Sequence, residues 1–135
     1  MNWLQRLAIL TVGFLAVVGS GCSGEAASPS TIAFHFSTFT PGIITARAGE
    51  PITITLRNED PIEHEWIVGP PEVHDRHRIG TEPAHDQIPT EVTVPAFSNR
   101  VTTVMFQEPG DYAFVCHLPG HEAYGMRGIL RVSPS

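Results

Sequence analysis

The sequence contains no lysine, and its eight cationic side chains are outnumbered by 14 acidic ones, which gives a formal net charge of -6. This balance disfavours nucleic-acid binding, because the phosphate backbone requires a cationic protein surface. Cysteine is also scarce, with only Cys22 and Cys116 in the chain. A disulfide between them is the simplest structural interpretation, but Cys22 lies in a stretch with the composition of a tether. The sequence therefore predicts neither a nucleic-acid partner nor a disulfide.

Long apolar runs are scarce as well. The run at residues 7–18 follows the cation Arg6, and it is shorter than the roughly 20 apolar residues that a transmembrane helix needs. Its length matches the hydrophobic part of a secretory signal peptide. We therefore predict that residues 1–21 are a signal peptide and that the protein is exported.

Small residues precede Cys22 as in a bacterial lipoprotein signal, although Gly19 occupies the position where leucine is usual. We favour lipidation of Cys22, with cleavage to a soluble form as the alternative. After Cys22, residues 23–30 are Ser, Gly, Ala and Pro with a single Glu, so residues 22–30 have the composition of a flexible tether. The predicted location is the periplasm, with the protein either free or attached through Cys22 to the outer side of the cytoplasmic membrane.

Residues 31–135 are enough for one domain with one core. The twelve glycines and twelve prolines of the chain are dispersed among short β-branched and aromatic runs, which favours many strands over long helices. Alternation places Ile32, Phe34 and Phe36 on one strand face, and Met105 is also expected in the core. We predict an all-β, two-sheet Greek-key β-sandwich of about seven or eight strands, with any short helix between residues 70 and 90.

Three potential metal ligands, Cys116, His121 and Met126, follow one another at five-residue intervals. Five residues turn a helix by about 140°, and an odd offset reverses the face of a strand, so neither structure brings the three together. A loop can do so, and the intervening proline and two glycines permit tight bends. The runs at residues 112–116 and 128–132 are typical of strands. We therefore expect the three side chains on a loop between two strands.

A thiol, an imidazole and a thioether together favour copper that cycles between Cu(I) and Cu(II). A further nitrogen ligand must come from elsewhere in the chain. His64 is the best candidate, because it follows a turn and opens an apolar strand. The acidic residues around it, Glu59, Asp60, Glu63 and Glu65, would either steer a basic redox partner or form only a solvated turn.

These features resemble the cupredoxins, the type 1 blue copper proteins of the azurin, plastocyanin and auracyanin kind. The resemblance covers about residues 30 to 133 and rests on the strand leading into the cysteine, the spacing of the C-terminal ligands and the mid-chain histidine. It implies a cupredoxin-like domain that binds one type 1 copper ion. The implied ligands are His64, Cys116, His121 and Met126.

Two departures from the family pattern concern the surroundings of the expected copper. Glu65 stands where Asn often follows the first histidine, and His117 stands where a small or hydroxylated residue often follows the cysteine. Both positions affect hydrogen bonding around the site, so we expect them to alter the redox potential. His117 is expected beside the site and not as a ligand.

The resemblance implies a monomeric one-electron carrier that meets a redox protein partner. It also implies that the C-terminal histidine ligand reaches the surface through an apolar patch, with Leu118, Pro119, Ala123 and Tyr124 as candidates. A copper-handling protein for resistance or delivery, which exchanges copper with a donor or acceptor, is the alternative. We predict that the protein is not an enzyme, because a cysteine nucleophile would leave the methionine unexplained and no oxyanion-hole motif is evident.

Residues 72–86 contain a second concentration of potential ligands. His74, His77 and His85 alternate there with carboxylates and would hold a second copper or zinc ion. The two arginines in the same segment oppose cation binding, and polar loops collect histidines by chance. A solvated connecting loop is therefore the favoured interpretation.

Overall fold

The computed structural model describes residues 30–80 and 88–135. The predicted signal peptide at residues 1–21, Cys22 and His85 lie outside the described residues. Within the described ranges, no helix has both the length and the apolar character needed to cross a membrane.

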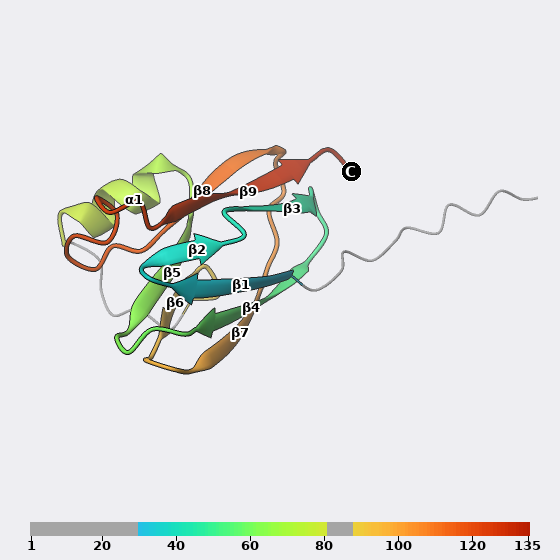
Figure 1. Cartoon of the computed structure of the whole chain (residues 1–135). Helices are drawn as coiled ribbons and strands as arrows, with labels where there is room; N and C mark the ends of the chain where they lie inside the picture. The colour runs from blue at the N-terminus through green and yellow to red at the C-terminus, as the bar shows by residue number, and fades with distance from the viewer. Residues whose placement is uncertain (1–29, 81–87) are drawn as a thin grey trace, which may run out of the picture.

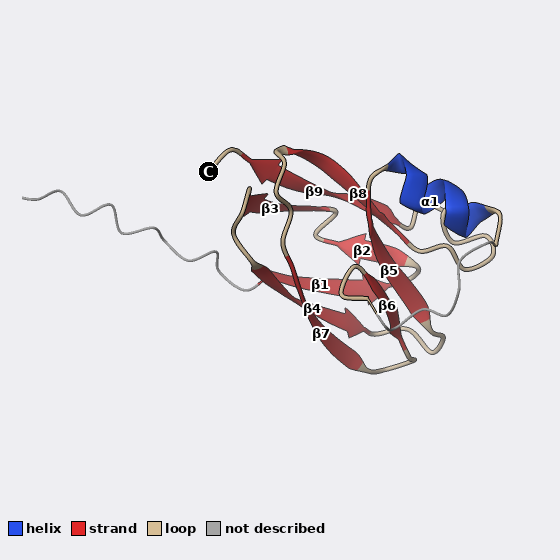
Figure 2. Ribbon diagram, turned by 180° about the vertical axis from the view of Figure 1, so that it is seen from behind, coloured by secondary structure: helices blue, strands red, loops and turns tan. Residues whose placement is uncertain are grey.

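In the described ranges, nine strands form two sheets that lie as two layers (Figures 1 and 2). The four-stranded sheet, in the order β2-β1-β4-β7, contains β1 (Ser30–His35), β2 (Thr38–Thr40), β4 (Ile52–Asn58) and β7 (Asn99–Val104). The five-stranded sheet, in the order β3-β9-β8-β5-β6, contains β3 (Ile43–Arg47), β5 (His64–Gly69), β6 (Glu91–Val94), β8 (Gly110–Val115) and β9 (Arg127–Ser133). The predicted all-β sandwich is confirmed.

Two pairs of parallel strands determine which strand ends lie next to each other. β1 runs parallel to β4, with Phe34 opposite Asn58, and β3 runs parallel to β9. Because parallel neighbours end at the same edge of a sheet, the turn that follows β1 lies beside the turn that follows β4. This edge of the sandwich carries part of the site described below.

The core lies between the sheets and follows the alternation of the sequence. In β4 the side chains of Ile52, Ile54 and Leu56 are buried, while the threonines between them are half-buried. The largest fully buried side chains include Trp66 and Phe114 from the other sheet. Apolar side chains from both sheets thus cover each other and exclude water, which is the main stabilising contribution to such a fold.

Two core predictions are wrong. Phe36 is 82% exposed, because β1 ends at His35 and the chain turns there, with positive φ at Phe36 and Ser37 (51° and 53°). Met105 is 52% exposed. In β7 the buried residues are Thr102 and Val104, so alternation would point the side chain of residue 105 outward. The strand has also ended at Val104.

A short helix does occur in the expected region. Helix α1 (Pro71–Arg78) begins with a proline at its first turn, a position where the missing N–H costs nothing. It lies against β5, and only His74 on it is buried. A side chain at Gly69 would collide with Val73, at 2.9 Å from a built Cβ, so this glycine allows the close approach of helix and strand. In both views α1 lies beside the loop between β8 and β9 (Figures 1 and 2).

Candidate metal centre

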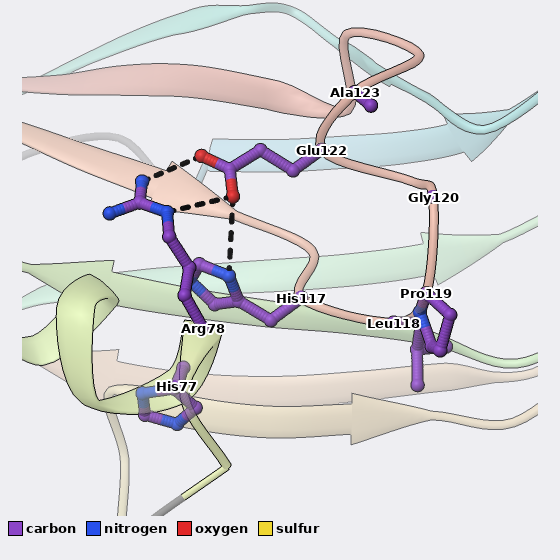
Figure 3. A pocket seen from close by; sticks show the side chains of 8 residues that line it. All are labelled: His77, Arg78, His117, Leu118, Pro119, Gly120, Glu122 and Ala123. Carbon is purple, nitrogen blue, oxygen red and sulfur yellow. Dashed lines mark hydrogen bonds and ion pairs between the residues drawn. The ribbon is translucent and has the colours of Figure 1, made fainter.

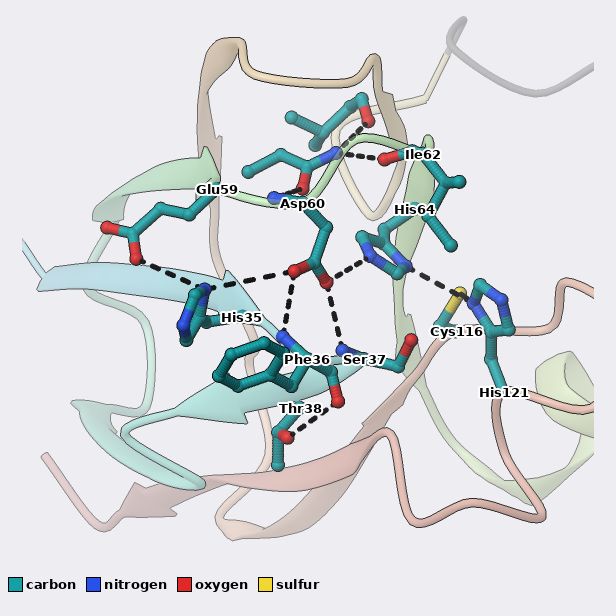
Figure 4. Close-up of polar contacts among 12 residues, drawn as sticks. His35, Phe36, Ser37, Thr38, Glu59, Asp60, Ile62, His64, Cys116 and His121 are labelled. Carbon is teal, nitrogen blue, oxygen red and sulfur yellow. Dashed lines mark hydrogen bonds and ion pairs between the residues drawn. The ribbon is translucent and has the colours of Figure 1, made fainter.

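Three of the four expected ligands converge at one end of the sandwich. His64 is the first residue of β5, Cys116 directly follows β8, and His121 lies in the loop before β9. The Nδ1 atoms of His64 and His121 are 3.2 Å apart, and the Sγ atom of Cys116 is 3.3 Å from Nδ1 of His121 (Figure 4). The ligand atoms of all three residues lie within 4.8 Å of one another. His64 and Cys116 are fully buried, and His121 is half-buried.

Backbone hydrogen bonds hold the loop that carries the C-terminal ligands. The N–H of Cys116 donates to the carbonyl of Met126 over 3.1 Å, and the N–H of Met126 donates to the carbonyl of His121 over 3.0 Å. Gly120 and Gly125 have positive φ, at 86° and 99°, a conformation that other residues rarely adopt. The loop is therefore closed across its base, as the proline and glycines predicted. Met126 itself is fully buried and belongs, like Cys116, to the hydrophobic core cluster.

A buried carboxylate fixes the orientation of His64. The Oδ2 atom of Asp60 lies 2.8 Å from Nε2 of His64, and the N–H groups of Phe36 and Ser37 donate to the same carboxylate over 2.8 Å and 2.9 Å (Figure 4). Burial opposes ionisation of Asp60, but these two N–H groups and His64 hold the pKa of its carboxyl below its ordinary value. Sequence reasoning missed this role, because it treated Asp60 as part of a surface acidic cluster. Asp60 and Glu65 are in fact buried.

Burial shifts the pKa of the Cys116 thiol and that of the His121 imidazole so that each group favours its neutral form. Burial raises the pKa of the Cys116 thiol to about 11, against the lowering effect of the N–H groups of Glu65 and Leu118. The N–H of Glu65 donates to the sulfur over 3.3 Å. Burial lowers the pKa of His121, and His64 beside it lowers it further. A metal ion would therefore displace one proton from the sulfur, and the lowered pKa of His121 favours the neutral imidazole that a metal requires.

The donor set fits copper. Two imidazole nitrogens and one thiolate, with a buried methionine on the same loop, match the trigonal His₂Cys site with a weak axial thioether that characterises blue copper. Hard cations such as Mg²⁺ and Ca²⁺ prefer oxygen ligands, which this cluster does not offer. The structure thus brings together three of the four selected residues, His64, Cys116 and His121, and Met126 is buried on the same loop.

The second cluster of histidines is arranged differently from the prediction. His74 uses both ring nitrogens, one at 3.1 Å from the carbonyl of Ala113 and the other at 3.0 Å from Nε2 of His117. His77 Nδ1 lies 2.8 Å from the carbonyl of Val73. In residues 30–80 and 88–135, the one group of three or more His, Cys, Asp or Glu side chains whose ligand atoms all lie within 4.8 Å of one another is that of the first site. The described residues give the alternative of a second metal site no support. The favoured interpretation of a solvated loop is wrong for residues 71–78, which form helix α1 with His74 buried.

His117 joins this second cluster and points away from the proposed ligands. Its ring stacks on that of His77 with centroids 5.3 Å apart, and its Nδ1 lies 3.6 Å from Glu122 (Figure 3). Arg78 binds both carboxylate oxygens of Glu122, at 3.0 Å and 2.6 Å. The end of α1 is therefore tied to the residue that follows His121. A cavity of about 380 Å³ at this contact is lined by His77, Arg78, His117, Leu118, Pro119, Gly120, Glu122 and Ala123.

The fold and the site together define a β-sandwich protein in which the start of one strand and a neighbouring loop bring two imidazole nitrogens and one thiol within 4.8 Å of one another. Residues 7–130 match the model of the cupredoxin-like domain, and the chain belongs to this family.

Two relatives and three solved structures place the chain more closely. It is 30% identical over 97 residues to the copper-resistant cuproprotein CopI of Rubrivivax gelatinosus, an alignment that covers 70% of this chain. That alignment covers 59% of the relative, so the chain spans less than two thirds of its length. The copper-resistant cuproprotein CopI of Pseudomonas aeruginosa is 26% identical over 129 residues, with 71% of each chain covered.

The solved structures that are similar include auracyanins. Dithionite-reduced auracyanin from the photosynthetic bacterium Roseiflexus castenholzii has a TM-score of 0.67 at 23% identity, over 82% of this chain and 100% of that one. Auracyanin B has a TM-score of 0.66 at 20% identity, over 82% and 91% of the two chains. Auracyanin A from Chloroflexus aurantiacus, described as a "blue" copper protein, has a TM-score of 0.61 at 25% identity, over 78% and 100%. These similarities confirm the cupredoxin fold.

Proposed function

We propose that this chain is an exported copper protein that binds one copper ion through His64, Cys116, His121 and Met126 and carries single electrons. The observation that carries the proposal is the convergence of two imidazole nitrogens and one thiol within 4.8 Å, from segments 57 residues apart in the sequence. Copper bound there would supply a one-electron couple between Cu(I) and Cu(II). The chain's own residues supply the fixed geometry.

The surrounding hydrogen bonds support fast electron transfer. Asp60 holds the ring of His64, the N–H of Glu65 holds the sulfur, and the backbone of Met126 closes the loop. Oxidised and reduced copper prefer different geometries, so a site that cannot rearrange keeps one compromise for both. Little reorganisation then accompanies the gain or loss of an electron.

The half-buried His121 is the proposed point of electron entry and exit. Pro119, Ala123 and Tyr124 beside it are exposed, and Tyr124 is 82% exposed. These residues support an apolar docking patch for a redox protein partner. The raised pKa of Cys116, to about 11, also supports a non-enzymatic role, because a protonated thiol is a poor nucleophile at neutral pH.

Copper handling is the second candidate, and it is favoured by the two relatives described as copper-resistant cuproproteins. In this role the same site would bind and buffer copper in the periplasm. A deletion strain separates the two functions. Sensitivity to added copper supports copper handling, whereas normal copper tolerance with loss of an electron-transfer activity supports the carrier.

The proposed domain organisation has a signal peptide at residues 1–21, a tether at 22–30 with lipidated Cys22, and a copper domain at 31–135. Ser30, the last residue of the proposed tether, is already part of strand β1. Mass spectrometry of the mature protein tests the anchor. An acylated Cys22 at the new N-terminus is expected, and an unmodified soluble form contradicts lipidation.

The spectrum of the copper-loaded domain tests the site. We expect strong visible thiolate-to-copper absorption with Cu(II), together with a type 1 spin-resonance signal. Cys116→Ser should abolish the colour, because the sulfur ligand is lost. His35→Gln is the matched control, since His35 is exposed and contacts none of the proposed ligands, and it should retain the colour. A colourless wild-type protein, or a coloured Cys116→Ser variant, contradicts the proposal.

A further inference from the structure

We propose that Asp60 is a positioning residue of the metal centre, which fixes the ring of His64 and favours the oxidised over the reduced copper ion. The inference rests on the proposed function, because it presumes copper at His64, Cys116 and His121. It concerns a residue that the ligand set does not include.

The carboxylate of Asp60 is held rigidly inside the protein. Asp60 is 6% exposed. Its Oδ1 atom accepts a hydrogen bond from the N–H of Phe36, and its Oδ2 atom accepts one from the N–H of Ser37 and also faces Nε2 of His64. Its own N–H donates to Oδ1 of Asn58 over 2.9 Å. The side-chain amide of Asn58 in turn donates to the carbonyls of Ile62, Val94 and Pro95. The turn that carries Asp60 is thus fixed on several sides (Figure 4).

The contact with Asp60 decides which nitrogen of His64 carries the proton. An ionised carboxylate can only accept a hydrogen bond, so Nε2 of His64 must donate over the 2.8 Å distance. A neutral imidazole then has its lone pair on Nδ1, the atom that faces His121. The ring is therefore presented to a metal in the required tautomer and orientation, as carboxylate–histidine–metal arrangements do elsewhere.

The same contact places a negative charge next to a ligand. When Cu(II) takes one electron from a redox partner and becomes Cu(I), the charge of the centre falls by one. A nearby carboxylate therefore stabilises the oxidised ion more than the reduced ion, and screening is weak because the site is buried. Hydrogen bonding from Nε2 to a carboxylate also raises the basicity of Nδ1, which acts in the same direction.

Asp60→Asn tests the charge, because it keeps the size of the side chain and an oxygen acceptor. We expect the variant to bind copper with its visible absorption. At a fixed ambient potential its ratio of Cu(I) to Cu(II) should rise at least about tenfold, which is about 59 mV for a one-electron couple. Glu59→Gln is the matched control. It removes the same charge one residue away, where Glu59 pairs with Arg57 and not with His64.

The outcomes of the potential measurement separate the alternatives. A rise in the reduction potential of Asp60→Asn, together with a much smaller rise for Glu59→Gln, supports the proposal. An unchanged or lowered potential for Asp60→Asn, or equal shifts for the two variants, overturns it. Absence of thiolate-to-copper absorption in the wild-type protein overturns the proposed function instead.

A second measurement needs neither the variant nor copper, which matters because Asp60 also anchors the turn at Phe36 and Ser37. Nitrogen-15 NMR of the metal-free wild-type protein reports the tautomer of His64 directly. We expect a proton on Nε2 that exchanges slowly with solvent. A proton on Nδ1 only, or rapid exchange at Nε2, overturns the positioning role.

Discussion

Cys116 and His117 are adjacent in the sequence and have separate roles in the structure. Cys116 faces His121 and the N–H of Glu65, whereas His117 contacts the second histidine cluster. Neighbouring residues at the end of a strand point to opposite faces, so a metal-ligating type next to a ligand need not join it. The residue type of His117 therefore does not show whether it joins the proposed ligands, whereas its contacts in the folded protein do.

The stability of the metal-free protein should depend on pH through His117. Burial, helped by His74 nearby, lowers the pKa of His117 from 6.5 to about 4. Between these values the unfolded chain binds a proton that the folded chain does not, so the free energy of unfolding falls as the pH drops. The loss is at most about 3 to 4 kcal/mol, because the pKa difference of about 2.5 is worth about 1.36 kcal/mol for each unit.

Urea unfolding at about pH 7 and about pH 4.5 measures this loss, and His117→Gln should reduce it. The variant has no ring to protonate, so its unfolding free energy should change less between the two conditions. Equal pH dependence in wild type and His117→Gln would count against a role for this burial.

At the scale of elements, the pairing of β8 with β9 sets the position of the metal loop. Phe114 in β8 lies opposite Gly128 in β9, and the ring of Phe114 occupies the space that a side chain would take. A Cβ built on Gly128 would lie only 2.2 Å from Cζ of Phe114 and 2.5 Å from the carbonyl oxygen of Gly42. The close approach of this ring to the β9 backbone therefore requires glycine.

Gly128→Ala should destabilise the fold by about 1–3 kcal/mol, the usual cost of overpacking, and towards the upper end because one neighbour is backbone. Gly42→Ala is the matched control, since its built Cβ meets nothing closer than 3.9 Å. Chemical denaturation of both metal-free variants provides the measurement. Unchanged stability of Gly128→Ala would mean that Phe114 moves aside without cost.

At the scale of the whole molecule, copper should act as a cross-link between the start of β5 and the loop before β9. The proposed ligands His64 and His121 are 57 residues apart and meet only in the folded chain. Copper binding should therefore stabilise the folded state, by about 2.7 kcal/mol when free copper is at a hundred times Kd. Because the thiol pKa is about 11, binding releases a proton at neutral pH, so this stabilisation should grow as pH rises.

Thermal unfolding with and without Cu(II), at about pH 6 and about pH 8, tests the effect. The wild-type melting temperature should rise with copper, and more so at the higher pH. Cys116→Ser should lose most of the gain, because its remaining donors are two imidazoles and a thioether. A copper-induced rise of equal size in Cys116→Ser would show that copper stabilises the protein from another place.

Local sequence features by themselves determined the inward face of a strand, the loop with three of the proposed ligands and the choice of the fourth. Alternation of apolar and polar residues specifies which face of β4 enters the core, and the spacing of Cys116, His121 and Met126 among proline and glycine specifies a loop. A histidine that opens an apolar strand was enough to select His64. Each of these features depends on a few neighbouring residues, so each can be read without the fold.

The tertiary structure alone decided the surroundings of the site. Asp60 meets Phe36 and Ser37 because β1 and β4 run parallel and end at one edge, a pairing that no local pattern reveals. His117 meets α1 because the helix packs beside the end of β8. Hydrogen-bond partners distant in the sequence depend on strand order and register, and these are set by the packing of the whole core.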